Sequence, residues 1–134
     1  MDRLLEMVEI VAQKHRDSWT VNENHVEVQL GETSRHQRVH LRLINGYYFF
    51  VSVVMGSAAV KKSVKRWNEI ALLTWQRNAD HELVTFAFDK HDRLVGLIRH
   101  PAEYLDPEEL EQYILTLTRE CDRFEYLLAG QDRF

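Results

Sequence analysis

Histidine and cysteine are the residue types of this chain that most readily bind metals or react, so their spacing is informative. Two of the seven histidines, His36 and His40, are four residues apart. On a helix, that spacing places two metal ligands side by side. Here polar and apolar residues alternate around His36 and His40, which indicates a strand. No Cys-x-x-Cys pair and no cluster of acids with histidines supplies further ligands. The sequence therefore predicts no metal site.

The sequence also contains no motif that indicates a catalytic nucleophile. Cys121, the single cysteine, lies on the apolar side of an expected helix between acidic neighbours, a setting that disfavours a reactive thiolate. No serine stands in a Gly-x-Ser-x-Gly turn, and no glycine-rich loop is present to hold a phosphate or a cofactor. We expect a protein that is not an enzyme and carries no cofactor. His100 with Glu103 or Asp106 stays open as an enzyme hypothesis.

One helix start supplies a weak candidate site for an anion. Gly56 and the residue after it are expected to begin a helix, whose first N–H groups are free to bind a negative group. Basic side chains follow within one or two turns. The candidate anion site consists of Ser57, Lys61 and Lys62.

A second cationic group lies on an expected strand. Arg38, His40 and Arg42 alternate with apolar residues, so they share one face. Glu27 and Gln29 of the neighbouring strand are expected to face the same way and to pair with them. The two interpretations that remain are a solvated face with cross-strand pairs and a face that binds a small anionic ligand.

Eight elements must position these residues. Apolar residues recur at helical spacing in three segments and alternate in five others, in the order α-β-β-β-α-β-β-α. This order predicts an α+β fold with an antiparallel five-stranded sheet and three helices, in a single domain of residues 1–134. The expected helices span 2–15, 57–77 and 107–129; the expected strands span 25–30, 38–43, 47–54, 82–89 and 94–99.

Local signals mark several of these boundaries. Asn45-Gly46 is typical of a type I′ hairpin turn, because both residues tolerate a positive φ. Asp106 and Glu109 stand in the spacing of a capping box at the start of the last helix. Gly130 is expected to end that helix as a left-handed glycine. Polar turns are expected at residues 31–34 and 78–81.

Composition limits the classes of partner and location. The chain has 134 residues, 17 basic and 21 acidic, with a formal net charge of −4. This balance argues against general binding to nucleic acid or to an anionic membrane. The longest apolar run is far shorter than the ~20 residues of a membrane helix, and the N-terminus lacks a signal peptide pattern. With one cysteine, we expect a cytoplasmic protein.

Charge is unevenly distributed between two of the expected helices. Basic residues dominate 57–78 and acidic residues dominate 101–125. Opposed charges of this kind indicate an intramolecular complement, a contact between two copies, or two solvated faces.

Apolar side chains exceed what one small sheet can cover. The strand 47–54 is apolar on both faces, and the helix 57–77 carries a wide apolar stripe. These features predict a homodimer contact or a surface that accepts a peptide. The candidate surface consists of Val60, Val64, Trp67, Ile70, Ala71, Trp75, Phe49, Val51 and Val53.

The element order and three segments resemble a known fold family. The segments are YYFFVSVV, SAAVKKSVKRWNEIALLTW and LVGLIRHPAEYLDPEELEQYI. The chain resembles the type III secretion chaperone-like fold and, within it, the YbjN-related bacterial proteins, which include uncharacterised cyanobacterial members. Secretion chaperones of this fold are homodimers that hold an extended segment of a client protein, often with the second long helix at the dimer seam. YbjN-related proteins are described as sensory-transduction regulators.

These observations together predict a non-enzymatic protein-binding module, chaperone-like or regulatory, that acts as a homodimer. Its expected partners are a second copy and a client or regulatory protein. The alternative is a small-ligand or anion sensor in bacterial signal transduction.

Overall fold

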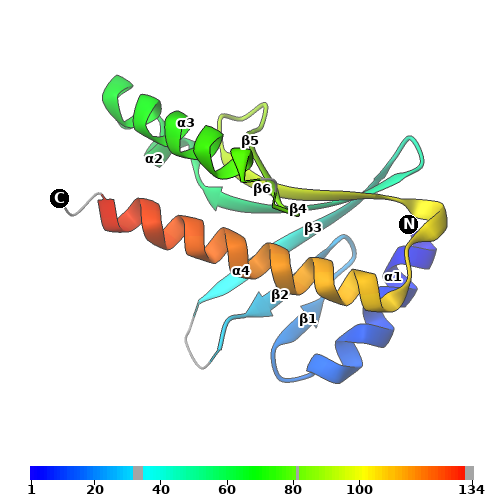
Figure 1. Cartoon of the computed structure of the whole chain (residues 1–134). Helices are drawn as coiled ribbons and strands as arrows, with labels where there is room; N and C mark the ends of the chain where they lie inside the picture. Colours follow the sequence, from blue (N-terminus) through cyan, green and yellow to red (C-terminus); the bar gives the residue numbers. More distant parts are fainter. Residues whose placement is uncertain (32–34, 81, 132–134) are drawn as a thin grey trace.

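The computed structural model describes residues 1–31, 35–80 and 82–131, and part of the predicted turns at 31–34 and 78–81 lies outside these ranges. The strands form one antiparallel sheet in the order β1-β2-β3-β4-β6-β5 (Figure 1). Helices lie on one side of it. The strands are β1 Trp19–Val21, β2 His25–Gln29, β3 His36–Ile44, β4 Tyr47–Met55, β5 Thr85–Phe88 and β6 Leu94–Pro101. The helices are α1 Asp2–Ala12, α2 Ser57–Val60, α3 Val64–Ala79 and α4 Pro107–Gln131, with short 3-10 turns η1 Gln13–His15 and η2 Ala102–Tyr104.

The prediction of an α+β fold is confirmed, whereas the predicted count of five strands is wrong. The additional strand is β1, in which Trp19 pairs with Val28 and Val21 pairs with Val26. Trp19 is buried. Three residues are too few to establish an alternating pattern, so pairing and burial, rather than sequence periodicity, define this strand.

The predicted count of three helices is also wrong, because the helix expected from residue 57 is two helices. The side-chain oxygen of Ser63 accepts a hydrogen bond from the Arg66 main-chain N–H at 3.0 Å and so forms the N-cap of α3. Ser57, by contrast, lies at the first position of α2, which has no side-chain capping bond and ends after four residues. The sequence offers two serines before one apolar stripe, and the second one begins the long helix.

Two predicted boundaries are confirmed and one is wrong. Asn45 and Gly46 have φ values of 50° and 81°, as a type I′ turn requires. At the start of α4, the Glu109 N–H donates to Asp106 Oδ1 at 2.8 Å, and the Asp106 N–H donates to Glu109 Oε1 at 3.3 Å. Gly130 does not end α4, which continues to Gln131. A glycine permits a left-handed helix end but does not force one.

The core lies between the sheet and the layer of α1 and α4. Side chains of alternate strand positions, such as Val39, Phe50 and Ile98, are buried beneath Ile114 and Phe124 of α4. We call this side the covered face. Every second residue of β2, β3 and β4 points to it, which explains the alternation seen in the sequence.

Gly96 on β6 lets α4 approach the covered face closely. A Cβ atom added at Gly96 would lie 2.5 Å from the Cys121 sulfur and within 3.2 Å of Val84 and Phe86 side-chain atoms. Cys121 is fully buried, as the sequence predicts. Burial raises the pKa of its thiol to about 12, so the sulfur is a packing atom rather than a nucleophile.

The Asn78 side chain joins α3 to the outer strand β5 through two hydrogen bonds. Asn78 Nδ2 donates to the Phe86 carbonyl oxygen at 2.7 Å, and the Phe86 N–H donates to Asn78 Oδ1 at 2.8 Å. The amide therefore occupies both main-chain groups of Phe86, as a neighbouring strand would.

Candidate interaction surface

The second face of the sheet carries no helix in the parts of the chain that the structure describes, and we call it the open face. The helices α1, α3 and α4 contact the covered face, each other or the β5 edge (Figure 1). Strand β4 sends Phe49, Val51 and Val53 to the open face, where they are half-buried. The predicted two-sided apolar strand is therefore covered on one side only.

The open face has an apolar half and an ionic half. The apolar half is formed by β4, β6 and β5, with Val51 opposite Leu97 and Val53 opposite Val95. A cavity of about 640 Å³ lies over it. The predicted residues Phe49, Val51 and Val53 all line this cavity.

One wall of the cavity is the turn between β5 and β6. The Asp89 carboxylate holds this turn by accepting hydrogen bonds from the His91 and Arg93 N–H groups at 2.9 and 3.0 Å, and from the Arg93 side chain. These bonds lower the pKa of Asp89, although burial acts in the opposite direction. Lys90 completes the wall. Residues 90–92 lie between the two predicted strands 82–89 and 94–99, and no periodic signal in the sequence places them beside β4.

The ionic half lies on β2 and β3. The Arg38 Nε donates to Glu27 Oε1 at 3.1 Å, which confirms the predicted cross-strand pair. The Arg38 hydrogen bond lowers the pKa of Glu27. His25 and His40 are also paired, with ring centres 5.8 Å apart. Burial, followed by the charges of His25 and nearby arginines, lowers the pKa of His40.

His40 and Arg42 connect the two halves, because both line the cavity. Arg42 is opposite Phe49 and His40 is opposite Val51 across β3 and β4. The cationic strand face predicted from Arg38, His40 and Arg42 therefore borders an apolar floor. The sequence could show each strand's alternation but not that these two surfaces would adjoin.

The predicted apolar stripe of residues 60–75 divides between the core and the surface. Val64 and Trp75 are 79% and 69% exposed, and Leu72, which lies on the same side of α3, is 56% exposed. Val60 and Ile70 are fully buried. These two belong to the core and offer no contact surface, because they point toward the sheet layer.

The remaining two residues of that stripe are intermediate. Ala71 is half-buried. The Trp67 ring packs against the Phe88 ring with centroids 4.8 Å apart, so it attaches α3 to β5. We call the exposed residues Val64, Leu72 and Trp75 the outer stripe of α3.

The predicted anion site at residues 57–62 loses part of its charge to an internal contact. Lys61 forms an ion pair with Asp92 of the β5–β6 turn. Lys62 is exposed, and Ser57 is half-buried at the start of a four-residue helix. A single helical turn provides little of the dipole that makes a long helix bind anions.

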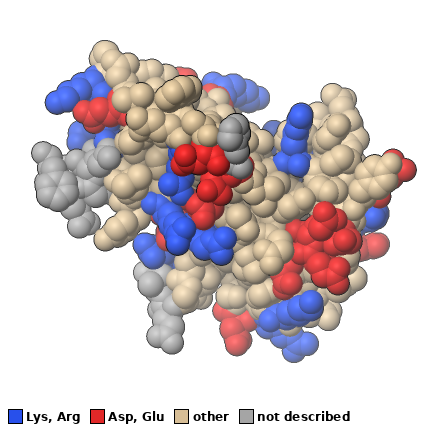
Figure 2. Space-filling model, in the orientation of Figure 1, with Lys and Arg blue, Asp and Glu red and all other residues tan. Residues whose placement is uncertain are grey.

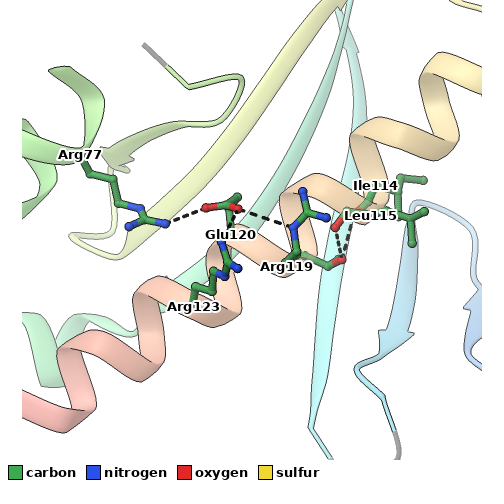
Figure 3. Close-up of polar contacts among 7 residues, drawn as sticks. Arg77, Ile114, Leu115, Arg119, Glu120 and Arg123 are labelled. Atoms are coloured by element: carbon green, nitrogen blue, oxygen red, sulfur yellow. Dashed lines mark hydrogen bonds and ion pairs between the residues drawn. The ribbon is translucent and has the colours of Figure 1, made fainter. Parts of the chain in front are cut away.

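The opposed charges of α3 and α4 partly complement each other within the chain. Glu120 lies at the centre of a cluster in which Arg77 Nη2 is 2.7 Å from Glu120 Oε2 (Figure 3). Arg123 Nη1 and Arg119 Nε lie 3.5 and 3.6 Å from Glu120 Oε1. Over the helix layer, acidic and basic side chains lie together near the middle of α4 (Figure 2). The intramolecular interpretation is therefore confirmed for this cluster.

The arrangement proposed for an acid–base enzyme is not assembled. His100 Nδ1 lies 2.8 Å from the Pro101 carbonyl oxygen, and its Nε2 lies 3.4 Å from Glu109. Asp106 caps α4, and Glu103 is exposed. Within the described residues, no three histidine, cysteine or acidic side chains are grouped to hold a metal ion. No helix in that part of the chain is long and apolar enough to span a membrane.

No protein-family model and no curated protein matches the sequence. Solved structures do match. The chain aligns with the ExsC-ExsE complex with a TM-score of 0.66 and 16% identity, over 95% of this chain and 94% of that one. It aligns with the heterodimeric complex ExoU-SpcU from the type III secretion system of Pseudomonas aeruginosa with a TM-score of 0.57 and 18% identity, over 87% and 93%.

A third match is the Yersinia pestis type III secretion chaperone SycH in complex with a fragment of YscM2. Its TM-score is 0.53 with 14% identity, over 88% of this chain and 96% of that one. The chain has a type III secretion chaperone-like fold. The finer resemblance to YbjN-related proteins stays a prediction. Among the described residues, apolar surface is uncovered on the apolar half of the open face and on the outer stripe of α3.

Proposed function

We propose that the chain is a non-enzymatic, homodimeric protein-binding module of chaperone-like or regulatory type. The observation that carries this proposal is the outer stripe of α3, on which Val64, Leu72 and Trp75 are each more than half exposed. Apolar groups of this size on one helix face are characteristic of protein contacts. The solved chaperone-fold structures that resemble the chain are complexes with other proteins, which supports the same role.

The outer stripe is the proposed contact with a second copy. A two-fold contact buries the same residues on both copies, so a single stripe supplies both halves of an interface. Trp75 is the expected anchor, because it is the largest of the three side chains and tryptophan commonly dominates interface energetics. The chaperone-like resemblance, which places the second long helix at the dimer seam, supports this choice of helix.

Trp75→Ser tests the dimer directly. We expect the wild-type chain to sediment as a dimer of the 15.9 kDa protomer, and Trp75→Ser to dissociate at concentrations where the wild type does not. Tyr104→Ser is the matched control, since Tyr104 is 70% exposed but lies in η2, away from α3. A wild-type chain that stays monomeric at high concentration would contradict the homodimer.

The alternative function is a sensor of a small anionic ligand. The cavity over the open face favours it, because His40 and Arg42 border a partly open space of about 640 Å³ with an apolar floor. A thermal-shift screen with nucleotides and phosphorylated metabolites tests this function. A ligand present at a hundred times its Kd stabilises a protein by about 2.7 kcal/mol, so an absence of any shift at millimolar concentrations would rule it out.

A further inference from the structure

The open-face cavity is lined by three basic side chains, Arg42, Lys90 and Arg93, and by one acidic side chain, Asp89. Arg42 and Lys90 are exposed on its border and form no ion pair with the described residues. Arg93 is neutralised by Asp89, whose carboxylate oxygen lies 2.7 Å from the Arg93 guanidinium. The cavity border therefore has an excess of positive charge at pH 7, and His40, which also lines the cavity, adds to it when protonated.

The floor of the cavity is apolar and continuous. Phe49, Val51 and Val53 form its centre, and Val95 and Leu97 extend it across β6. Val95 is only 4% exposed, whereas the three β4 side chains are half-buried. Binding of an occupant is therefore favoured by the apolar area that it covers. The charges around the floor make the binding specific.

Two helices of a second copy are poorly suited as occupants. Lys62, just before α3, and Lys65 on α3 would approach Arg42 and Lys90 with like charge. The acidic helix α4 has much of its charge engaged, since Glu120 and Asp122 pair with arginines of the same chain. Charge complementarity favours an acidic segment of a different protein over α3 or α4 of a second copy.

We propose that the open-face cavity binds an acidic amphipathic segment of a partner protein. Its apolar side chains lie on the floor formed by Phe49, Val51 and Val53, and its carboxylates lie against Arg42 and Lys90. This inference rests on the protein-binding role proposed above and assigns the chemistry of the partner. It is separate from the dimer contact, which uses the outer stripe of α3.

His40 makes this binding pH-dependent. The groups that face His40 are His25 on β2, Arg38 and Arg42 on β3, and Arg93 from the β5–β6 turn. Arg38 and Arg93 are paired with the Glu27 and Asp89 carboxylates, whereas Arg42 forms no ion pair with the described residues, so a proton on His40 adds to the net positive charge of the cavity border. A bound carboxylate raises the pKa of His40, and by linkage the segment binds more tightly as the pH falls from 7.5 toward 6.

Calorimetric titration with two short synthetic peptides tests the inference. One is an amphipathic peptide of Leu and Glu, and the other has Lys in place of every Glu. We expect the Glu peptide to bind the wild-type protein, with affinity that falls as salt is added, and the Lys peptide not to bind. The double variant Arg42→Glu with Lys90→Glu is expected to weaken binding of the Glu peptide about tenfold or more.

A matched double variant controls for net charge. Lys14→Glu with Arg16→Glu changes the total charge equally on exposed residues near η1, on the helix side of the molecule, and should leave binding unchanged. Circular dichroism of both double variants checks that they keep the fold. Equal binding of the two peptides, or equal loss in both double variants, would overturn the inference.

Two further outcomes separate this inference from the proposed function. If the wild-type protein dimerises but does not bind the Glu peptide, the partner chemistry is wrong and the dimer stands. If NMR signals of Val51 and Leu97 shift on dilution of the protein alone, a second copy covers the open face and the inference is overturned. If the protein is monomeric but binds the Glu peptide through Arg42 and Lys90, the inference survives without the homodimer.

Discussion

The covered and open faces of the sheet are built from the same strands, and both are apolar along β4. On the covered face, Phe50 and Val54 are closed over by α4 and are at most 3% exposed. On the open face, Phe49, Val51 and Val53 stay half-buried beside Arg42 and Lys90. The difference shows that apolar alternation alone does not distinguish a buried face from an open one. The two faces differ in the charged side chains that lie beside the apolar residues.

The largest expected difference in stability is between two variants that each lose one aromatic ring. One ring lies on the covered face and the other on the open face. Phe124 is fully buried on α4 and packs edge-on against the Phe86 ring, so Phe124→Ala should lower the free energy of unfolding by about 3–5 kcal/mol. Phe49→Ala should cost no more than about 1–2 kcal/mol, since its ring is only half-buried. Urea unfolding followed by circular dichroism measures both. Similar losses would mean that the open face is also part of the core.

Gly96→Ala tests how tightly the covered face is closed. The added methyl would lie 2.5 Å from the Cys121 sulfur, so we expect a loss of about 1–3 kcal/mol in the free energy of unfolding. In the Cys121→Ala background the added methyl should cost less, with a coupling of about 0.5–3 kcal/mol between the two sites. Gly56→Ala is the control, because nothing lies within 4 Å of a Cβ there. An additive double variant would show that the sulfur is not the obstacle.

Two adjacent residues of β3 give a comparison of polar contacts. Gln37 is buried on the covered face, where its Oε1 accepts a hydrogen bond from Ser52 Oγ at 2.7 Å. Gln37→Ala leaves Ser52 without this partner and should cost about 1–2 kcal/mol in thermal or urea unfolding. Arg38→Ala, on the open face, should leave the stability nearly unchanged, because its pair with Glu27 is exposed to water. A larger loss for Arg38→Ala would reverse the assignment of the two faces.

The smallest expected effect is the pH dependence contributed by His40. The pKa of His40 is lower in the folded chain than its usual 6.5, so the folded state binds fewer protons than the unfolded state as the pH falls through that value. The contribution of His40 to the free energy of unfolding is therefore fully present above pH 6.5 and decreases as the pH falls below that value. His40→Gln should flatten the dependence of the unfolding midpoint on pH between about 7.5 and 5.5.

The sequence predicted the local features well, because their signals lie within a few residues. Asn45 and Gly46 form the expected turn, and Asp106 with Glu109 forms the expected capping box. The alternation around Val39 identified a strand with one buried face. The helix after residue 57 was predicted too long, because Ser57 and Ser63 both have the side chain that an N-cap needs and only packing selects between them.

The candidate site was predicted in part. Phe49, Val51 and Val53 were identified because a strand that is apolar on both faces needs a second covering, and they line the cavity. Lys90 could not be identified, because it reaches the cavity through a turn whose position depends on pairing between β5 and β6. Val60 was misplaced, because helical spacing shows that residues share a side but not which side faces the core.

The bond between Asn78 and β5 has a consequence for how copies of this protein can assemble. A sheet grows into a filament only if each added chain offers a free strand at both of its ends. Here the amide of Asn78 occupies the N–H and the carbonyl of Phe86, so the β5 end of the sheet is closed at that residue. Strand-to-strand joining between copies is therefore hindered at this point of the β5 edge. A protein with exposed apolar surface is in this way less prone to open-ended polymerisation through that edge.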